Sequence, residues 1–346
     1  IGASFRLYLI ASVLQFAIFD SWNFPFFLTV IITLSLIWIY TYRSGIKTII
    51  WTDTLQTTFM LATVLIIAIS VSKSLGLNFS QVIDTIQNSS YSKVFFFDDF
   101  GDQKHFLKQF LSGVFMAIVM TGLDQDQMQK NLSCKNLGEA KKNMFVFSTI
   151  LIVVDLLFLS LGALLYIYSS EIGLAIPSDA DMLFPNIALN SGLPEYVGIL
   201  FIIGIIAAAY SSADSALTSL TTSFCVDIID FKKYNSEKQI FIRKYSHLLL
   251  SLVLLGVILL FRSINDQSVI KSLFTVAGYT YGPLLGLYSF GMFTKINIRD
   301  KLVPLICIVS PVICYFIKMR FSSIGFELLI INGLITFLLL LICRKN

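Results

Sequence analysis

The stretch AAAYSSADSALTSLTTS covers residues 207–223 and directly follows the apolar run VGILFIIGII of residues 197–206. It carries eight Ser and Thr side chains and one carboxylate, Asp214, in a segment long and apolar enough to span a membrane. At about 100° per residue, most of the polar side chains of such a helix fall within an arc of about 160°. The residues on this face are Ala208, Ser211, Ser212, Asp214, Ser215, Thr218, Ser219 and Thr222.

The hydroxyl side chains and the carboxylate of this stretch have different explanations. Ser and Thr are common where membrane helices pack together, so the hydroxyls alone are explained equally well by packing or by ligand binding. A charge at mid-membrane costs roughly 2.5–3.5 kcal/mol on insertion scales, and packing does not require it. Asp214 therefore indicates a partner or a function.

The composition places this helix in a polytopic membrane protein. Of the 346 residues, 56% are hydrophobic and only 13% are charged, whereas soluble domains have about 25% charged residues. We expect one transmembrane domain over residues 1–346, with residues 73–105 as an external loop. The predicted spanning helices are about 4–20, 24–42, 48–72, 106–126, 144–168, 196–226, 246–261, 272–293, 302–318 and 324–343.

The distribution of charge predicts the orientation of these helices and excludes several functions. Most of the 25 Lys and Arg residues fall in loops on one side if both chain ends are cytoplasmic. The net charge of +4 then reflects topology and indicates no nucleic-acid partner. The five Cys have no metal-site spacing, and no catalytic arrangement of His, Cys or paired carboxylates is evident, so we do not expect an enzyme.

A second acidic residue, Asp53, lies near the inner end of the helix predicted over residues 48–72. The predicted depths of Asp53 and Asp214 in the membrane agree within the uncertainty of helix boundaries read from sequence, which is two to four residues at each boundary. Carboxylates and hydroxyls that converge in a low-dielectric region bind a small hard cation. The alternative is that one of the two carboxyls is protonated by its neighbour's charge.

Four segments of the chain resemble the sodium/solute symporter family. They are GIKTIIWTDTLQ (45–56), GLDQDQMQKNLSCKNLGEAKK (122–142), AAAYSSADSALTSLTTSFCVDI (207–228) and YTYGPLLGLYSFGMF (279–293). The resemblance implies an all-α transporter fold of two inverted five-helix repeats with alternating access. The chain does not begin with Met, and its first helix resembles the third core helix, so the resemblance implies that the first core helices are missing from this sequence.

The resemblance also implies functional residues. Half of a sodium site maps onto the Ala208 carbonyl and the Ser211 and Ser212 hydroxyls. The second cation site of members that resemble sialic-acid transporters maps onto Asp53, Ser211, Asp214 and Ser215, with Asp214 in place of a serine. Arg6 maps onto an arginine that binds the substrate carboxylate, although a positive-inside arginine near a helix end explains it as well.

We therefore expect a sodium-coupled symporter of a small organic solute, with Na+ as the only cofactor. An anionic carboxylate such as sialic acid is favoured slightly through Arg6, and a neutral sugar or an amino acid is the alternative. A channel or a nutrient sensor on the same scaffold is the alternative class. The expected location is the cell inner membrane, multi-pass, with a cytoplasmic C-terminus; the expected partners are the solute and the lipid bilayer, and no oligomer is required.

Overall fold

A computed structural model describes residues 2–41, 46–264 and 268–345. The side chains of residues 40, 41, 46–50, 52, 125, 126, 209–215 and 264 lie outside this description. The chain divides into two compact units, and we describe each by itself. Unit 1 comprises Ile1–Ser92 and Gln129–Val269, and unit 2 comprises Lys93–Met128 and Ile270–Asn346.

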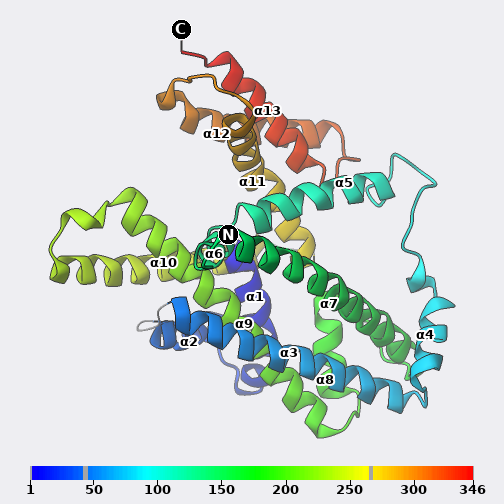
Figure 1. The fold of residues 1–346 in the computed structure, drawn as a ribbon. Helices are drawn as coiled ribbons and strands as arrows, with labels where there is room; N and C mark the ends of the chain where they lie inside the picture. Colours follow the sequence, from blue (N-terminus) through cyan, green and yellow to red (C-terminus); the bar gives the residue numbers. More distant parts are fainter. Residues whose placement is uncertain (1, 42–45, 265–267, 346) are drawn as a thin grey trace. The chain divides into compact units, whose positions relative to one another are not determined.

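The described residues of unit 1 form several long helices and some short ones (Figure 1). They are α1 (Gly2–Leu14), α2 (Phe26–Thr41), α3 (Ile46–Ser74), α4 (Phe79–Gln87), α7 (Leu137–Glu171), α8 (Leu183–Asn190), α9 (Glu195–Ser223) and α10 (Ser236–Ile264). The helix α6 (Gln125–Leu132) crosses the boundary between the units. Two π-helical turns, Gln15–Phe19 and Phe224–Ile228, extend α1 and α9.

Local hydrogen bonds explain where two of these helices begin. The Asn136 side chain accepts the backbone N–H of Glu139 at 2.9 Å and caps α7. At α4, Asn78 and Gln81 form a capping box, in which each side chain accepts the other residue's backbone N–H. Residues 73–105, predicted as an external loop, contain the short helix α4, which begins at this capping box. The external location of these residues stays a prediction.

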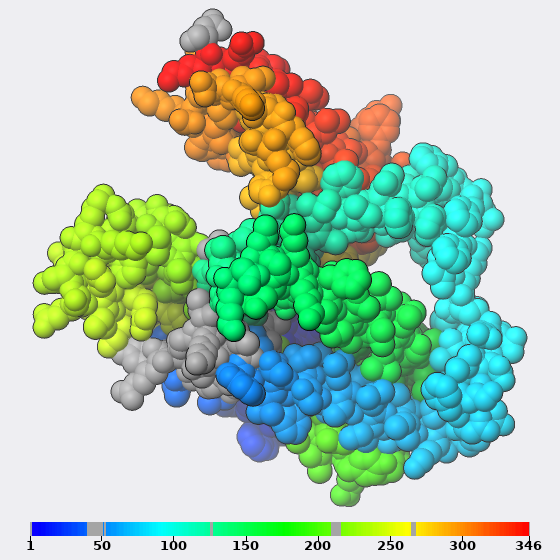
Figure 2. Space-filling view, viewed as in Figure 1, coloured from blue at the N-terminus to red at the C-terminus, as the bar shows by residue number. Residues whose placement is uncertain are grey.

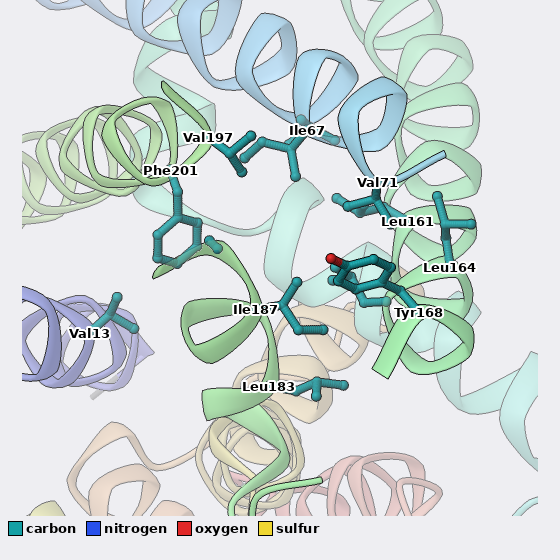
Figure 3. Close-up of a cluster of buried hydrophobic side chains, with 13 residues drawn as sticks. Val13, Ile67, Val71, Leu161, Leu164, Tyr168, Leu183, Ile187, Val197 and Phe201 are labelled. Atoms are coloured by element: carbon teal, nitrogen blue, oxygen red, sulfur yellow. The ribbon is translucent and has the colours of Figure 1, made fainter. Parts of the chain in front are cut away.

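The core of unit 1 is an apolar cluster to which five helices contribute (Figure 3). Ile67 of α3, Ile187 of α8 and Val197 of α9 are each fully buried in it. Figure 2 shows the blue surface of α3 lying directly against the green surface of α7. Because lipid is as apolar as these side chains, their close packing holds the helices together more than burial from water does.

Unit 2 contains α5 (Phe106–Ala117), its π-helical extension Ile118–Gly122, α11 (Val269–Phe293), α12 (Val303–Arg320) and α13 (Leu328–Ile342). The segment before α5 is fixed onto the connection between α12 and α13. Gln103 Nε2 donates to the Ser322 carbonyl at 2.8 Å, and Lys108 Nζ lies 3.6 Å from Glu327 Oε1. Lys108 Nζ also donates to the Gly101 carbonyl at 3.5 Å, so the FFFDDFGD stretch of residues 95–102 is joined to α5 within unit 2.

A neutral polar network joins α11, α12 and α13. Asn332 Nδ2 donates to the carbonyls of Gly278 at 3.0 Å and Tyr279 at 2.9 Å. The Ser310 hydroxyl donates to Asn332 Oδ1, and the Thr336 hydroxyl donates to Ser310 Oγ at 2.9 Å. The side chains of Ser310, Asn332 and Thr336 are all 0% exposed.

The network explains why α11 continues through its internal proline. Pro283 has no N–H, so the Tyr279 carbonyl four residues earlier loses its helical donor. Asn332 supplies that donor from α13, which satisfies a carbonyl that would otherwise be left unpaired inside a membrane. The sequence YTYGPLLG predicts that Gly282 and Pro283 break or bend this helix; α11 runs through both residues without a break.

Each predicted spanning window contains helix in the described residues. Within the described ranges, five helical segments are both long and apolar enough to cross a membrane: Gly2–Trp22, Asp53–Ser74, Leu137–Glu171, Ser236–Ser263 and Asp300–Arg320. Shorter apolar helices are Phe26–Ile39, Phe106–Gly122, Glu195–Ala208, Ala216–Ile228 and Leu328–Ile342. The prediction of a multi-pass helical membrane protein is confirmed, whereas a single domain over residues 1–346 stays a prediction.

Candidate functional site

A cavity of about 360 Å³ lies in unit 1, between α1, α3, α7, α8 and α9. Small-molecule sites in proteins typically have volumes of roughly 300–1,000 Å³. Apart from Arg6, Thr63 and Asp181, the described residues of the lining are apolar side chains and glycine. The cavity can therefore hold a small solute whose body is mainly apolar.

The cavity brings together two residues that the sequence predicted to be functional. Arg6 of α1 and Ala208 of α9 both line it. The close approach of α3 and α9 positions Ala208, because Gly204 lies one turn earlier on α9 and a Cβ there would be only 3.0 Å from Thr63 Cγ2. A glycine at residue 204 thus lets the two helices meet at the cavity wall.

Four predicted cation ligands fall on the part of α9 whose side chains lie outside the description. These are Ser211, Ser212, Asp214 and Ser215. Their helical backbone continues directly from Ala208, which lies at the cavity. Whether their oxygens form the sodium site and the second cation site stays a prediction.

Arg6 presents its guanidinium without a partner in the described part of the chain. Its side chain is exposed, and it has no ion pair or hydrogen bond among those residues. A planar guanidinium binds a carboxylate through two parallel hydrogen bonds, which gives orientation as well as affinity. Arg6 can therefore bind an anionic group in the cavity.

Asp181 is a cavity residue that the sequence analysis did not select. It lies in the 3₁₀ turn Ala180–Met182, just before α8, and its Oδ2 accepts the backbone N–H of Val269 at 2.7 Å. Burial raises the pKa of the Asp181 carboxyl, the Val269 N–H lowers it, and the charge of Asp179 raises it further. Its only signal in the sequence was its place in an acidic loop without Lys or Arg, directly before an apolar helix.

Asp53, predicted as a cation ligand, already holds a cation from the chain itself. Lys130 Nζ of α6 donates to Asp53 Oδ2 at 2.9 Å, and the two side chains are 27% and 17% exposed. The ammonium occupies one of the coordination directions that a sodium ion on Asp53 would need. Sequence reasoning missed this pair, because the two residues lie 77 positions apart in the chain.

Comparisons with known proteins agree on one family. A profile of the sodium:solute symporter family matches residues 5–300. The sodium/sialic acid symporter NanT of Aliivibrio fischeri is 23% identical over 283 residues, which cover 80% of this chain and 55% of that protein. The sodium-dependent multivitamin transporter of Oryctolagus cuniculus is 27% identical over 283 residues, covering 80% and 43%.

A solved structure extends the likeness to the fold. It is the substrate-bound outward-open state of a Na+-coupled sialic acid symporter, which aligns with a TM-score of 0.75 and 19% identity, over 99% of this chain and 74% of that chain. This likeness confirms the predicted all-helical transporter fold. The chain spans about half the length of the curated relatives it matches. Because the family profile covers most of its residues, the chain belongs to the sodium:solute symporter family.

Proposed function

We propose that the whole protein is a sodium-coupled secondary active symporter that carries a small organic carboxylate across the cytoplasmic membrane by alternating access. Family membership, the fold likeness and the five long apolar helices support this proposal. Relatives whose names specify sodium and sialic acid, such as SiaT of Proteus mirabilis at 23% identity, support the coupling ion and an anionic solute.

The observation that carries the proposal is the shared cavity of Arg6 and Ala208. Arg6 is the group for the solute's carboxylate, and Ala208 belongs to the proposed sodium site with Ser211 and Ser212. A solute and an ion that bind at adjoining positions stabilise each other's binding, and that coupling makes transport depend on sodium. Each sodium ion that enters with the solute contributes about 2.3 kcal/mol per 100 mV of membrane potential.

A second cation site of Asp53, Ser211, Asp214 and Ser215 completes the proposal. In it, sodium replaces the Lys130 ammonium on Asp53 during part of the transport cycle. The variants Asp53→Asn and Asp214→Ser are then expected to lower the Hill coefficient of uptake for sodium. Unchanged sodium affinity and stoichiometry in both variants would remove the second site.

We also propose that the protein lies in the cell inner membrane with its C-terminus in the cytoplasm. The distribution of Lys and Arg among the loops supports this orientation. The proposal requires no oligomer.

Uptake by the full-length protein in proteoliposomes tests the function. With an inward sodium gradient, at least one of a panel of organic carboxylates that includes sialic acid is expected to accumulate above its external concentration, and a sodium ionophore is expected to abolish the accumulation. Arg6→Lys should raise the half-saturating solute concentration about tenfold or more, because an ammonium cannot reproduce the bidentate geometry. Arg262→Lys, on a residue that does not line the cavity, is the matched control.

The other function classes correspond to distinct outcomes of this experiment. Sodium currents without accumulation would indicate a channel, and solute binding without flux would indicate a sensor. Accumulation of a neutral sugar, unaffected by Arg6→Lys, would leave symport standing and remove the carboxylate from the proposal.

A further inference from the structure

The cavity carries two opposite charges in an otherwise nearly apolar lining. Arg6 lies on α1, and Asp181 lies in the turn before α8, so different elements supply them. The structure shows no ion pair between them among the described residues, although both line one cavity. A solute that fills this cavity is therefore exposed to a guanidinium and to a carboxylate at once.

Asp181 has acceptor capacity left for a bound molecule. A carboxylate offers about four lone-pair positions, and the structure shows one occupied by the Val269 N–H. The nearby Asp179 differs: its Oδ1 accepts the backbone N–H of Asp181 at 3.0 Å, its side chain is exposed, and it does not line the cavity. Of the two carboxylates in this loop, only Asp181 is placed to contact a solute.

We infer that Asp181 is a specificity-determining residue that accepts a hydrogen bond from the solute, and that the solute is an amino or hydroxy acid with an apolar body. The inference rests on the proposed function and deepens it by naming the substrate class. The solute's carboxylate binds Arg6, its ammonium or hydroxyl group donates to Asp181, and its body contacts the aliphatic and aromatic lining. The solute therefore makes two directional contacts: its carboxylate with the Arg6 guanidinium, and its donor group with the Asp181 carboxylate.

The apolar lining argues against a solute with many hydroxyl groups. Each hydroxyl moved from water into contact with side chains such as Leu9, Phe184 and Phe201 loses hydrogen bonds that those side chains cannot replace. In contrast, a benzyl or branched alkyl group loses nothing there. Among these wall residues, only Arg6, Thr63 and Asp181 offer side-chain polar groups, enough for two or three polar groups on the solute.

Three probes with one body isolate the role of Asp181. Phenylalanine, 3-phenyllactate and 3-phenylpropionate share a carboxylate and a phenyl ring, and differ by an ammonium, a hydroxyl or a hydrogen at one carbon. Binding of each probe to the purified full-length protein in sodium buffer is measured by titration calorimetry. The protein is expected to bind phenylalanine or phenyllactate about tenfold more tightly than phenylpropionate, the value of one hydrogen bond to a charged group.

Asp181→Asn is expected to reduce this affinity ratio to about threefold or less. The amide carbonyl of the new side chain still accepts the Val269 N–H, but the negative charge that strengthens the bond to the solute is gone. Asp179→Asn, the neighbouring exposed carboxylate, should keep the full difference. Equal discrimination in Asp181→Asn and in the unchanged protein would overturn the inference, as would a preference for phenylpropionate. So would the absence of binding by all three probes at about 10 mM.

These outcomes are separable from a failure of the proposed function. If sialic acid accumulates with sodium while the three probes do not bind, symport stands and the apolar-bodied class is wrong. If no solute accumulates under a sodium gradient, the coupling proposal fails, while loss of probe discrimination in Asp181→Asn still establishes the role of Asp181 in binding.

Discussion

Two polar clusters, one in each unit, differ in charge and in exposure to solvent. In unit 2, Ser310, Asn332 and Thr336 are neutral, 0% exposed and bonded to one another and to backbone carbonyls. In unit 1, Asp53 and Lys130 are charged, 17% and 27% exposed, and joined at 2.9 Å. The first set is closed to solvent, whereas the second stays within reach of water and ions.

The difference follows from the cost of removing each kind of group from water. A buried amide with all its hydrogen bonds made is stable in a membrane interior, and it fixes the packing of the helices that it joins. A buried charge costs far more, so an ion pair that must exchange its partner is better placed where solvent can enter. We therefore expect changes in the Asn332 network to alter stability, and changes at Asp53 and Lys130 to alter the response to ions.

The largest effect is expected from Asn332→Leu. The substitution keeps the side-chain volume but removes the donor to the Gly278 and Tyr279 carbonyls, whereas the Ser310 hydroxyl keeps the backbone carbonyl of residue 332 as an acceptor at 3.0 Å. At about 1–3 kcal/mol for each unsatisfied buried group, the protein should lose roughly 3 kcal/mol of stability. The thermal unfolding midpoint of the purified full-length protein measures this loss.

Asn190→Leu is the matched control, because Asn190 is exposed at the end of α8 and bonds only the Asn186 side chain, at 3.0 Å. Equal midpoints for the two variants would show that the Asn332 network does not stabilise unit 2.

A smaller loss is expected from Gly282→Ala. A Cβ at this position would lie 2.4 Å from the Asn332 side chain, which the network holds in place. Overpacking of this kind typically costs about 1–3 kcal/mol. Gly291→Ala on the same helix has nothing within 4 Å of its new Cβ and should keep the original midpoint. If Gly282→Ala is tolerated equally well, the contact between α11 and α13 is looser than the structure shows.

A double-mutant cycle tests whether Asn332 substitutes for the donor that Pro283 lacks. In Pro283→Ala the backbone N–H returns and can bond the Tyr279 carbonyl within α11. Asn332→Leu should then cost about 1 kcal/mol less than it does beside the proline. The unfolding midpoints of the four proteins give the coupling. Purely additive effects would mean that the Asn332 amide does not act through this carbonyl.

The two kinds of polar site also differ in how far the sequence could predict them. Apolar windows predicted the helices, because each window depends on a single stretch of chain. The pairs Asp53 with Lys130 and Asp181 with Val269 join residues 77 and 88 positions apart, and hydrophobic periodicity carries no information about such contacts. Arg6 and Ala208 were predicted as site residues only through a family resemblance, and the cavity now places them together. The missed helix α4 depends on one capping box, Asn78 with Gln81, whose four-residue signal is weak beside the apolar windows.

The smallest change in stability is expected from breaking the Asp53–Lys130 pair, and its effect on the unfolding midpoint should depend on the salt that is present. Lys130→Met removes the ammonium from Asp53 and, since the pair is partly exposed, should cost only about 1 kcal/mol or less in a sodium-free buffer. The released carboxylate can then bind sodium, which stabilises the folded state by mass action. The unfolding midpoint of Lys130→Met should therefore rise more steeply with sodium chloride than with choline chloride.

Lys130→Arg, which keeps a cation beside Asp53, should behave like the unchanged protein in both salts. The same variants can be compared in uptake. Lys130→Met should reach its half-maximal rate at a sodium concentration several-fold lower than the unchanged protein does, because the Lys130 ammonium no longer competes with sodium for Asp53. Identical sodium dependence in Lys130→Met and Lys130→Arg would mean that Asp53 binds no ion. The Asp53–Lys130 pair would then have a structural role, as the Asn332 network has. The two polar clusters would differ only in charge and in exposure to solvent, and not in function.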